Sequence, residues 1–187
     1  MSEVRKLLQQ ALETAASIHD DSVKARALGL IAKAQVKAGD SAAGGKTFQQ
    51  AREAAASIHD DSAKAQALGV IAHAQAEAGN FGGALETASG IHDDSVKAQA
   101  LGVIAKAQAE AGNFGGALET ASGIHDDSLK AWALWAIAKA QVKAGGARGV
   151  LAWATNRNLP LLKLGALLGV AEGLLERVEA KKPKSKN

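Results

Sequence analysis

The residues best suited to chemistry lie in a tetrapeptide, His-Asp-Asp-Ser, that starts at His19, His59, His92 and His125. Imidazole and carboxylate groups bind zinc and calcium, so a row of such turns could hold divalent cations. Helix capping calls for the same residue types, since Asp and Ser accept hydrogen bonds from the free N–H groups of a first turn. One His with two Asp is an incomplete zinc set, and packed helices lie about 10 Å apart. We therefore expect no metal site, and helix caps at Asp94 and Ser95 in the third copy.

Two other segments have part of a catalytic or nucleotide-binding pattern. Residues 39–47 end in Gly-Lys-Thr, but Asp40 occupies the position at which a phosphate loop needs its first Gly. A predicted helix, not a strand, precedes that segment. His73 has no Asp, Ser or Cys at a spacing that would make it part of a triad. We expect no catalytic residue, no cofactor and no enzymatic activity.

The tetrapeptides recur at spacings of 40, 33 and 33 residues, which is typical of stacked repeats. In each copy a capping turn precedes a long apolar-periodic run, and a Gly follows it. We expect an all-α solenoid over residues 1–180. The predicted long helices (A) are 23–38, 63–78, 96–111 and 129–144, with a final helix over 161–178. The predicted second helices (B) include 4–17, 42–57 and 114–123, and the units are 22–61, 62–94, 95–127 and 128–160, followed by a basic disordered tail at 181–187.

The composition agrees with close-packed helices and restricts the class of protein. The chain has 187 residues, a net charge of +3, 3% aromatic residues and no cysteine. Much of the positive charge lies in the tail, so it does not describe a nucleic-acid-binding face. No apolar signal core follows the first residues, and no apolar run is long enough to span a membrane. We expect a cytoplasmic protein that does not bind membranes.

Comparison of the four copies divides each long helix into two halves. The constant positions of the first copy, such as Ala25, Leu28 and Ile31, fall on one half of the helical wheel, and the changing positions on the other. The constant half must pack against neighbours, and the changing half faces solvent or a partner. One constant position is polar, with Gln35, Gln75, Gln108 and Gln141. A buried amide needs a partner, so we expect each Gln to bond a neighbouring loop or helix end.

At Leu101-Gly102 and Ala84 the chain resembles tetratricopeptide repeats, which are also helix pairs with Leu-Gly in the first helix and a small residue in the second. The family's Trp and Tyr are replaced here by Ala98 and Ala105, and its closing Pro by the Asp pair. The resemblance implies a right-handed superhelix whose A helices line a concave groove for a protein or peptide. The changing residues that would face that groove are Arg26, Leu30, Lys33, Gln66, Val70, His73, Gln99, Val103, Lys106, Trp132 and Lys139. The family's clamp for a C-terminal carboxylate is not recognisable, so that ligand class is not implied.

Three alternatives concern the end of the chain and the basic residues. Trp132 and Trp135 either close the last unit or anchor a ligand, and we favour closure because terminal repeats are usually atypical. The last helix, packed on the fourth A helix with Trp153 between them, has Leu on more than one face, so we expect a monomer or a weak homodimer through helical ends. The chain could instead be a self-associating building block. A nucleic-acid groove would use Arg26, Lys33, Lys37, Lys106, Lys139 and Lys143, but Glu77 and Glu110 interrupt that stripe, and we do not expect it.

Overall fold

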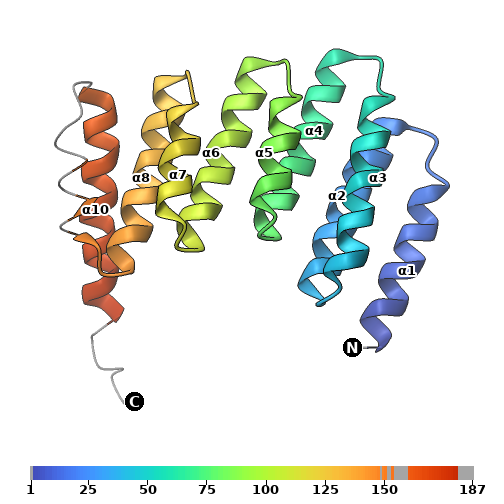
Figure 1. Cartoon of the computed structure of the whole chain (residues 1–187), viewed down its shortest axis with the longest axis horizontal. Helices are drawn as coiled ribbons and strands as arrows, with labels where there is room; N and C mark the ends of the chain where they lie inside the picture. The colour runs from blue at the N-terminus through green and yellow to red at the C-terminus, as the bar shows by residue number, and fades with distance from the viewer. Residues whose placement is uncertain (1, 148, 151–152, 154–159, 181–187) are drawn as a thin grey trace. The chain divides into compact units, whose positions relative to one another are not determined.

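A computed structural model describes residues 2–147, 149–150, 153 and 160–180, and Figure 1 shows their helices. The helices are α1 (Ser2–Ala16), α2 (Asp21–Lys37), α3 (Ser41–Ala56), α4 (Asp61–Glu77), α5 (Phe81–Ser89), α6 (Asp94–Glu110), α7 (Phe114–Ser122), α8 (Asp127–Lys143) and α10 (Pro160–Ala180). These residues contain no strand, which confirms the all-α class. The helices divide between two compact units, residues 1–100 and 101–187. The superhelix and the tetratricopeptide-like identity stay predictions.

The long and short helices alternate as the repeats predict. We call α2, α4, α6, α8 and α10 the A-type helices, and α1, α3, α5 and α7 the B-type helices. The 17-residue A-type helices are longer than the 9-residue α5 and α7, and α3 has 16 residues. Each predicted boundary lies within a few residues of the observed one. The predicted tail at 181–187 and most of the segment after α8 lie outside the described residues.

Asp caps begin four of the A-type helices, α2, α4, α6 and α8, but one residue earlier than we expected. The first Asp of each pair accepts a hydrogen bond from the backbone N–H three residues later, with N–O distances of 2.9, 2.7, 2.8 and 2.7 Å for Asp20, Asp60, Asp93 and Asp126. The second Asp, such as Asp94, lies in the first turn, where its carboxylate opposes the helix dipole. The prediction of Asp94 and Ser95 as the cap was therefore wrong, and the cap of α6 is Asp93.

A glycine with positive φ ends four A-type helices. Gly39, Gly79, Gly112 and Gly145 have φ of 86, 78, 82 and 99°, the left-handed region that a side chain disfavours. Asp40 directly follows the first of them and caps α3 through a 3.0 Å bond from the Ala43 N–H. Thr47 lies buried inside α3. Residues 39–47 are therefore a helix–helix turn followed by a helix, as expected, and they do not form a phosphate loop.

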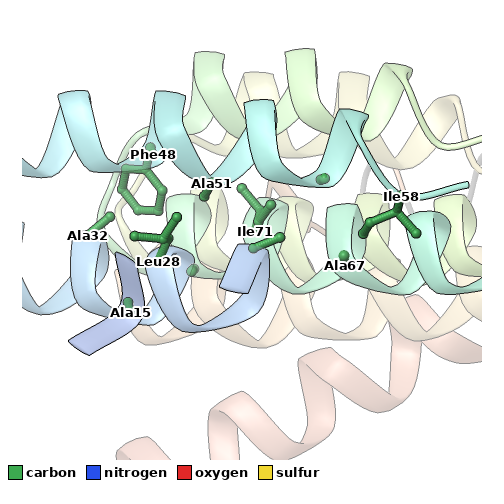
Figure 2. Packing of buried hydrophobic residues seen from close by; sticks show 11 residues of the cluster. Ala15, Leu28, Ala32, Phe48, Ala51, Ile58, Ala67 and Ile71 are labelled. Carbon is green, nitrogen blue, oxygen red and sulfur yellow. The ribbon is translucent and has the colours of Figure 1, made fainter. Parts of the chain in front are cut away.

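The core of the first unit consists of small residues that let helices approach closely. Figure 2 shows Phe48 of α3 beside Leu28 and Ala32 of α2, and all three side chains are buried. At Gly29, an added Cβ would lie 3.3 Å from the side chain of Ile71 of α4. Comparison of the copies puts Gly29 on the changing half, since the equivalent residue of α8 is Trp135, but Gly29 is buried because α4 packs directly against it.

The buried Gln side chains have partners in the following B-type helices. Thr87 donates to Gln75 Oε1 at 2.7 Å, and Thr120 donates to Gln108 Oε1 at 2.8 Å. Each Thr lies twelve residues after its Gln, so the bond joins an A-type helix to the next B-type helix. We expected a loop or helix end as partner, and the partner is a hydroxyl in the last turn of the B-type helix. At the equivalent positions, Trp153 Nε1 donates to Gln141 at 3.3 Å, whereas Gln35 Oε1 has no hydrogen-bond partner among the described residues.

In the second unit, α10 packs along α8 through a row of three glycines, Gly165, Gly169 and Gly173 (Figure 1). A Cβ at any of them would come within 3.0 Å of the α8 backbone or overlap it. The spacing of four residues keeps all three on one face of α10. Trp153 packs against a buried cluster that includes Val142 of α8 and Val170 of α10. The last helix therefore lies against α8 as predicted, and Trp153 packs on a cluster to which both helices contribute, while the glycines let the two backbones touch directly.

Candidate ligand-binding face of the A-type helices

The eleven residues predicted to face a partner all keep their side chains exposed or half-buried. Several of them bond other parts of the chain. Lys33 pairs with Glu77, Lys139 pairs with two Glu of α10, and Arg26 donates to Ser22 within its own helix. Within the second unit, Lys106 and Lys139 line one hollow. These two residues are the part of the predicted set that the structure brings to a common cavity.

In the first unit, Glu77 lies among basic residues from two successive A-type helices. Lys33 Nζ of α2 donates to Glu77 Oε2 at 2.9 Å, and His73 Nε2 lies 3.8 Å from the same oxygen. The hydrogen bond from Lys33, together with the charges of Lys33, His73 and Lys37, lowers the pKa of Glu77 below its ordinary value of 4.5. This cluster binds one carboxylate between two helices, with the acid supplied by the chain itself.

In the second unit, Lys139 and Lys143 of α8 contact acids of α10. Lys139 Nζ lies 2.7 Å from Glu176 and 3.2 Å from Glu172, and Lys143 pairs with the other oxygen of Glu176. The hydrogen bonds from Lys139 and Lys143 lower the pKa of Glu176, and the bonds to Glu176 and Glu172 raise the pKa of Lys139. Lys139 also lies 5.0 Å from the ring centroid of Trp135, a cation–π distance. Trp135 therefore lies beside the ion pairs that join α8 to α10.

A hollow of about 410 Å³ opens between α6 and α8, within the second unit. Its apolar floor consists of Ala109, Phe114, Trp135, Ala136, Ala140 and Ala144, and its charged rim consists of Lys106, Glu110, Lys139 and Lys143. Lys106 and Lys143 are 45% and 51% exposed, so each ammonium group can reach an incoming ligand in addition to the acid that it already contacts, Glu110 for Lys106 and Glu176 for Lys143. An apolar floor with a few convergent charges is the usual make-up of a ligand site.

The repeat shows which group is missing from this hollow. Lys106 and Lys33 occupy equivalent positions of their helices, and Lys143 occupies the position of Glu77. In the first unit the two positions form the 2.9 Å pair between α2 and α4. In the second unit the same two positions on α6 and α8 are both Lys. The acid nearest to Lys106 is Glu110 of its own helix, whose carboxylate lies 3.8 Å away and is 63% exposed.

The two tryptophans of α8 differ in their surroundings. The ring of Trp132 packs over Gly102, where an added Cβ would lie 3.3 Å from it, and the residue is 39% exposed. The Trp135 ring is half-buried and lines the hollow, and its centroid lies 6.5 Å from that of Trp132. The set predicted from sequence included Trp132 and omitted Trp135 and Lys143. The substitution of Lys for Glu at position 143, seen by comparing the copies, could have indicated Lys143.

The remaining candidate chemistry does not assemble into a site in the described part of the chain. No three His, Asp or Glu side chains come together there in a way that could hold a metal ion. None of the helices described has the length and apolar character needed to cross a membrane. Comparison of the chain with protein-family models, with curated proteins and with solved structures finds no match.

Proposed function

We propose that this chain is a non-enzymatic, tetratricopeptide-like scaffold that binds a protein or peptide segment on the face of its A-type helices. The observation that carries the proposal is the hollow between α6 and α8, with its apolar floor and two Lys at positions that elsewhere hold a Lys–Glu pair. A ligand at this place supplies the missing acid. The ligand is therefore a peptide with an Asp or Glu flanked by apolar residues.

The chain supplies its own examples of the proposed contact. Glu77 accepts from Lys33 across two A-type helices, and Glu176 accepts from Lys139 in the same way. A peptide carboxylate between Lys106 and Lys143 reproduces this arrangement between α6 and α8. Asp and Glu are suited to it because a charge-assisted N–H···O bond is shorter and stronger than a neutral one.

The apolar floor supplies most of the affinity. An ion pair between exposed groups contributes only about 0–1 kcal/mol, because water and salt screen it. Burial of one apolar side chain against Trp135 and the neighbouring Ala residues contributes about 1.5–3 kcal/mol. The carboxylate therefore sets the position and the charge preference of the peptide, and the apolar neighbours determine how tightly it binds.

A random peptide array probed with the labelled chain tests the proposal. We expect the bound peptides to be enriched in Asp or Glu next to Leu, Ile, Val or Phe. The Lys143→Glu variant restores the Lys–Glu pattern of α2 and α4 within the chain, so Lys106 gains an internal partner and peptide binding is lost. Lys143→Arg keeps the charge and keeps binding.

Lys46→Glu is the matched control, because it makes the same charge change at an exposed position of α3 that does not line the hollow. It leaves binding unchanged. Bound peptides without any acidic preference, or peptides that bind the Lys143→Glu variant as well as they bind the unmodified chain, would show that the hollow is not the binding site.

A further inference from the structure

α10 is an A-type helix in which the normally buried face is exposed. Two ion pairs between successive A-type helices define how α10 aligns with the other copies. Lys33 pairs with Glu77 of the next A-type helix, and Lys139, at the position equivalent to Lys33, pairs with Glu176. Glu176 therefore occupies the position of Glu77, which is also that of Lys37 and Lys143. In that register, the buried residues Ala25, Gly29, Ala32 and Gln35 of α2 correspond to Leu164, Leu168, Ala171 and Leu174 of α10. The three Leu are 52%, 49% and 43% exposed, and the next residue, Leu175, is 62% exposed. The face that packs inward in α2 is thus an open apolar stripe in α10.

In the first unit, the next B-type helix, α3, and the next A-type helix, α4, pack against these positions of α2. A Cβ added to Gly44 of α3 would lie 2.9 Å from the main-chain oxygen of Ala32 and would overlap Val36. Val36 of α2 corresponds to Leu175 of α10. The stripe on α10 therefore has the register of a docking surface for a B-type helix.

α1 is a B-type helix with the complementary exposed face. Residues 7–20 align with 47–60 without a gap, since both contain Gln-Gln-Ala in the helix and end in Ser-Ile-His-Asp. Gly44, Thr47, Phe48 and Ala51 of α3 are buried, and they correspond to Val4, Leu7, Leu8 and Ala11 of α1. Val4 and Leu7 are 46% and 59% exposed, and Leu8 and Ala11 are only half-buried. The exposed face of α1 is therefore the one by which a B-type helix packs on the A-type helix before it.

The two faces also match in chemistry. Inside the repeats, a Gln of the A-type helix bonds a Thr of the B-type helix, at 2.7 Å for Gln75 with Thr87. In α10 the Gln position holds Leu174, and in α1 the Thr position holds Leu7. Leu thus replaces both members of the polar pair. A Leu–Leu contact leaves no buried polar group unpaired, whereas packing either Leu against the Gln or Thr of a repeat would leave that Gln or Thr without its hydrogen bond.

We infer that α1 of one copy packs on α10 of a second copy and completes the helix pair that α10 begins. The two copies use different surfaces, so this head-to-tail contact leaves one free α1 and one free α10 in every dimer. Such contacts build rings if the rotation closes and open chains if it does not. This assembly is independent of the peptide-binding hollow between α6 and α8.

Two variants of the full chain, each blocked at one end, test the inference. Leu7→Glu blocks the α1 face, and Leu175→Glu blocks the α10 face; both positions are exposed, so the fold tolerates the charge. Sedimentation velocity over a concentration series measures the assembly, and circular dichroism confirms that both variants stay helical. Lys6→Gln, at an exposed position on the opposite side of α1, lowers the net charge by the same amount as each blocking substitution; it is the matched control and assembles like the unmodified chain.

We expect the unmodified chain to form larger species with rising concentration and each blocked variant alone to stay monomeric. An equimolar mixture of the two variants forms a one-to-one dimer that grows no further, because only one compatible pair of faces remains. A monomeric unmodified chain at high concentration would overturn the inference. Dimers of the Leu7→Glu variant alone would also overturn it, since they would show that α10 pairs with a second α10.

Discussion

Gly169 lies where α10 comes closest to α8, and Gly169→Ala is the substitution that tests this packing. A Cβ there would overlap the carbonyl oxygen of Trp135 and would lie 2.9 Å from the Cβ of Ala138. The Trp135 carbonyl belongs to a helix backbone, so it cannot move aside as a flexible side chain would. The helices must separate, and the contacts at Gly165 and Gly173 loosen with them.

The expected loss of stability follows from two opposing terms. Overpacking a close contact costs about 1–3 kcal/mol, and a rigid backbone neighbour favours the upper value. Replacing Gly by Ala inside a helix contributes about 1 kcal/mol in the other direction. The net loss is then about 2 kcal/mol, which for a chain of this length lowers the Tm by about 4–8 °C. Thermal and urea unfolding followed by circular dichroism measure both quantities.

Gly115→Ala is the control within the same unit, because a Cβ at Gly115 of α7 meets no atom within 4 Å. It leaves stability unchanged or raises it by up to about 1 kcal/mol, through helix propensity alone. The two variants are therefore expected to shift Tm in opposite directions or to differ by several degrees. Equal stability of Gly169→Ala and Gly115→Ala would refute the close-packing account.

Three further predictions concern caps, buried polar pairs and pH. Asp93→Ala removes the cap of α6 and costs about 1 kcal/mol in chemical unfolding, more than Asp94→Ala, which removes only a charge near the helix dipole. Thr87→Val leaves its buried Gln partner unsatisfied and costs about 1–3 kcal/mol, whereas Thr47→Val costs less, because no hydrogen bond to Gln35 Oε1 is lost; equal costs would contradict this. Because the folded-state pKa of Glu176 lies below 4.5, its pairs stabilise the fold above that pH and are lost as pH falls through the lowered pKa, so Glu176→Gln abolishes that part of the acid sensitivity of Tm.

The repeat pattern predicted the helices because each copy carries its own start and stop signals. The Asp-Asp-Ser turns and the Gly after each long helix act locally, so the boundaries follow from neighbouring residues alone. The cap position was missed by one residue, since either Asp satisfies the pattern and only backbone geometry selects Asp93. The Gly29 contact with Ile71 was missed because it depends on a helix that lies about forty residues away in the sequence.

The candidate site was predictable only in part, because it depends on which side chains meet between helices. Comparison of the copies placed Lys106 and Lys139 on the changing half, and both line the hollow. The ion pairs of Lys33 and Lys139 could not be predicted from the sequence, since their partners Glu77, Glu172 and Glu176 belong to other helices. For the same reason, reversing the charge of Lys33 or Lys139 would disturb packing between helices. Lys143 also pairs with an acid of another helix, Glu176, but its side chain is 51% exposed, so reversing its charge disturbs the packing less.

The central claim is that an acidic, apolar peptide binds in the hollow between α6 and α8. The chain has three tryptophans, so the indole N–H signals of a proton–nitrogen NMR spectrum can be assigned by single Trp→Phe substitutions. Titration with a peptide selected on the array measures where it binds. The account predicts that the Trp135 signal moves with saturation, together with the amides of Ala109 and Ala140, and that Lys143→Glu abolishes the shift. A peptide that binds while the Trp135 signal stays in place would contradict the account.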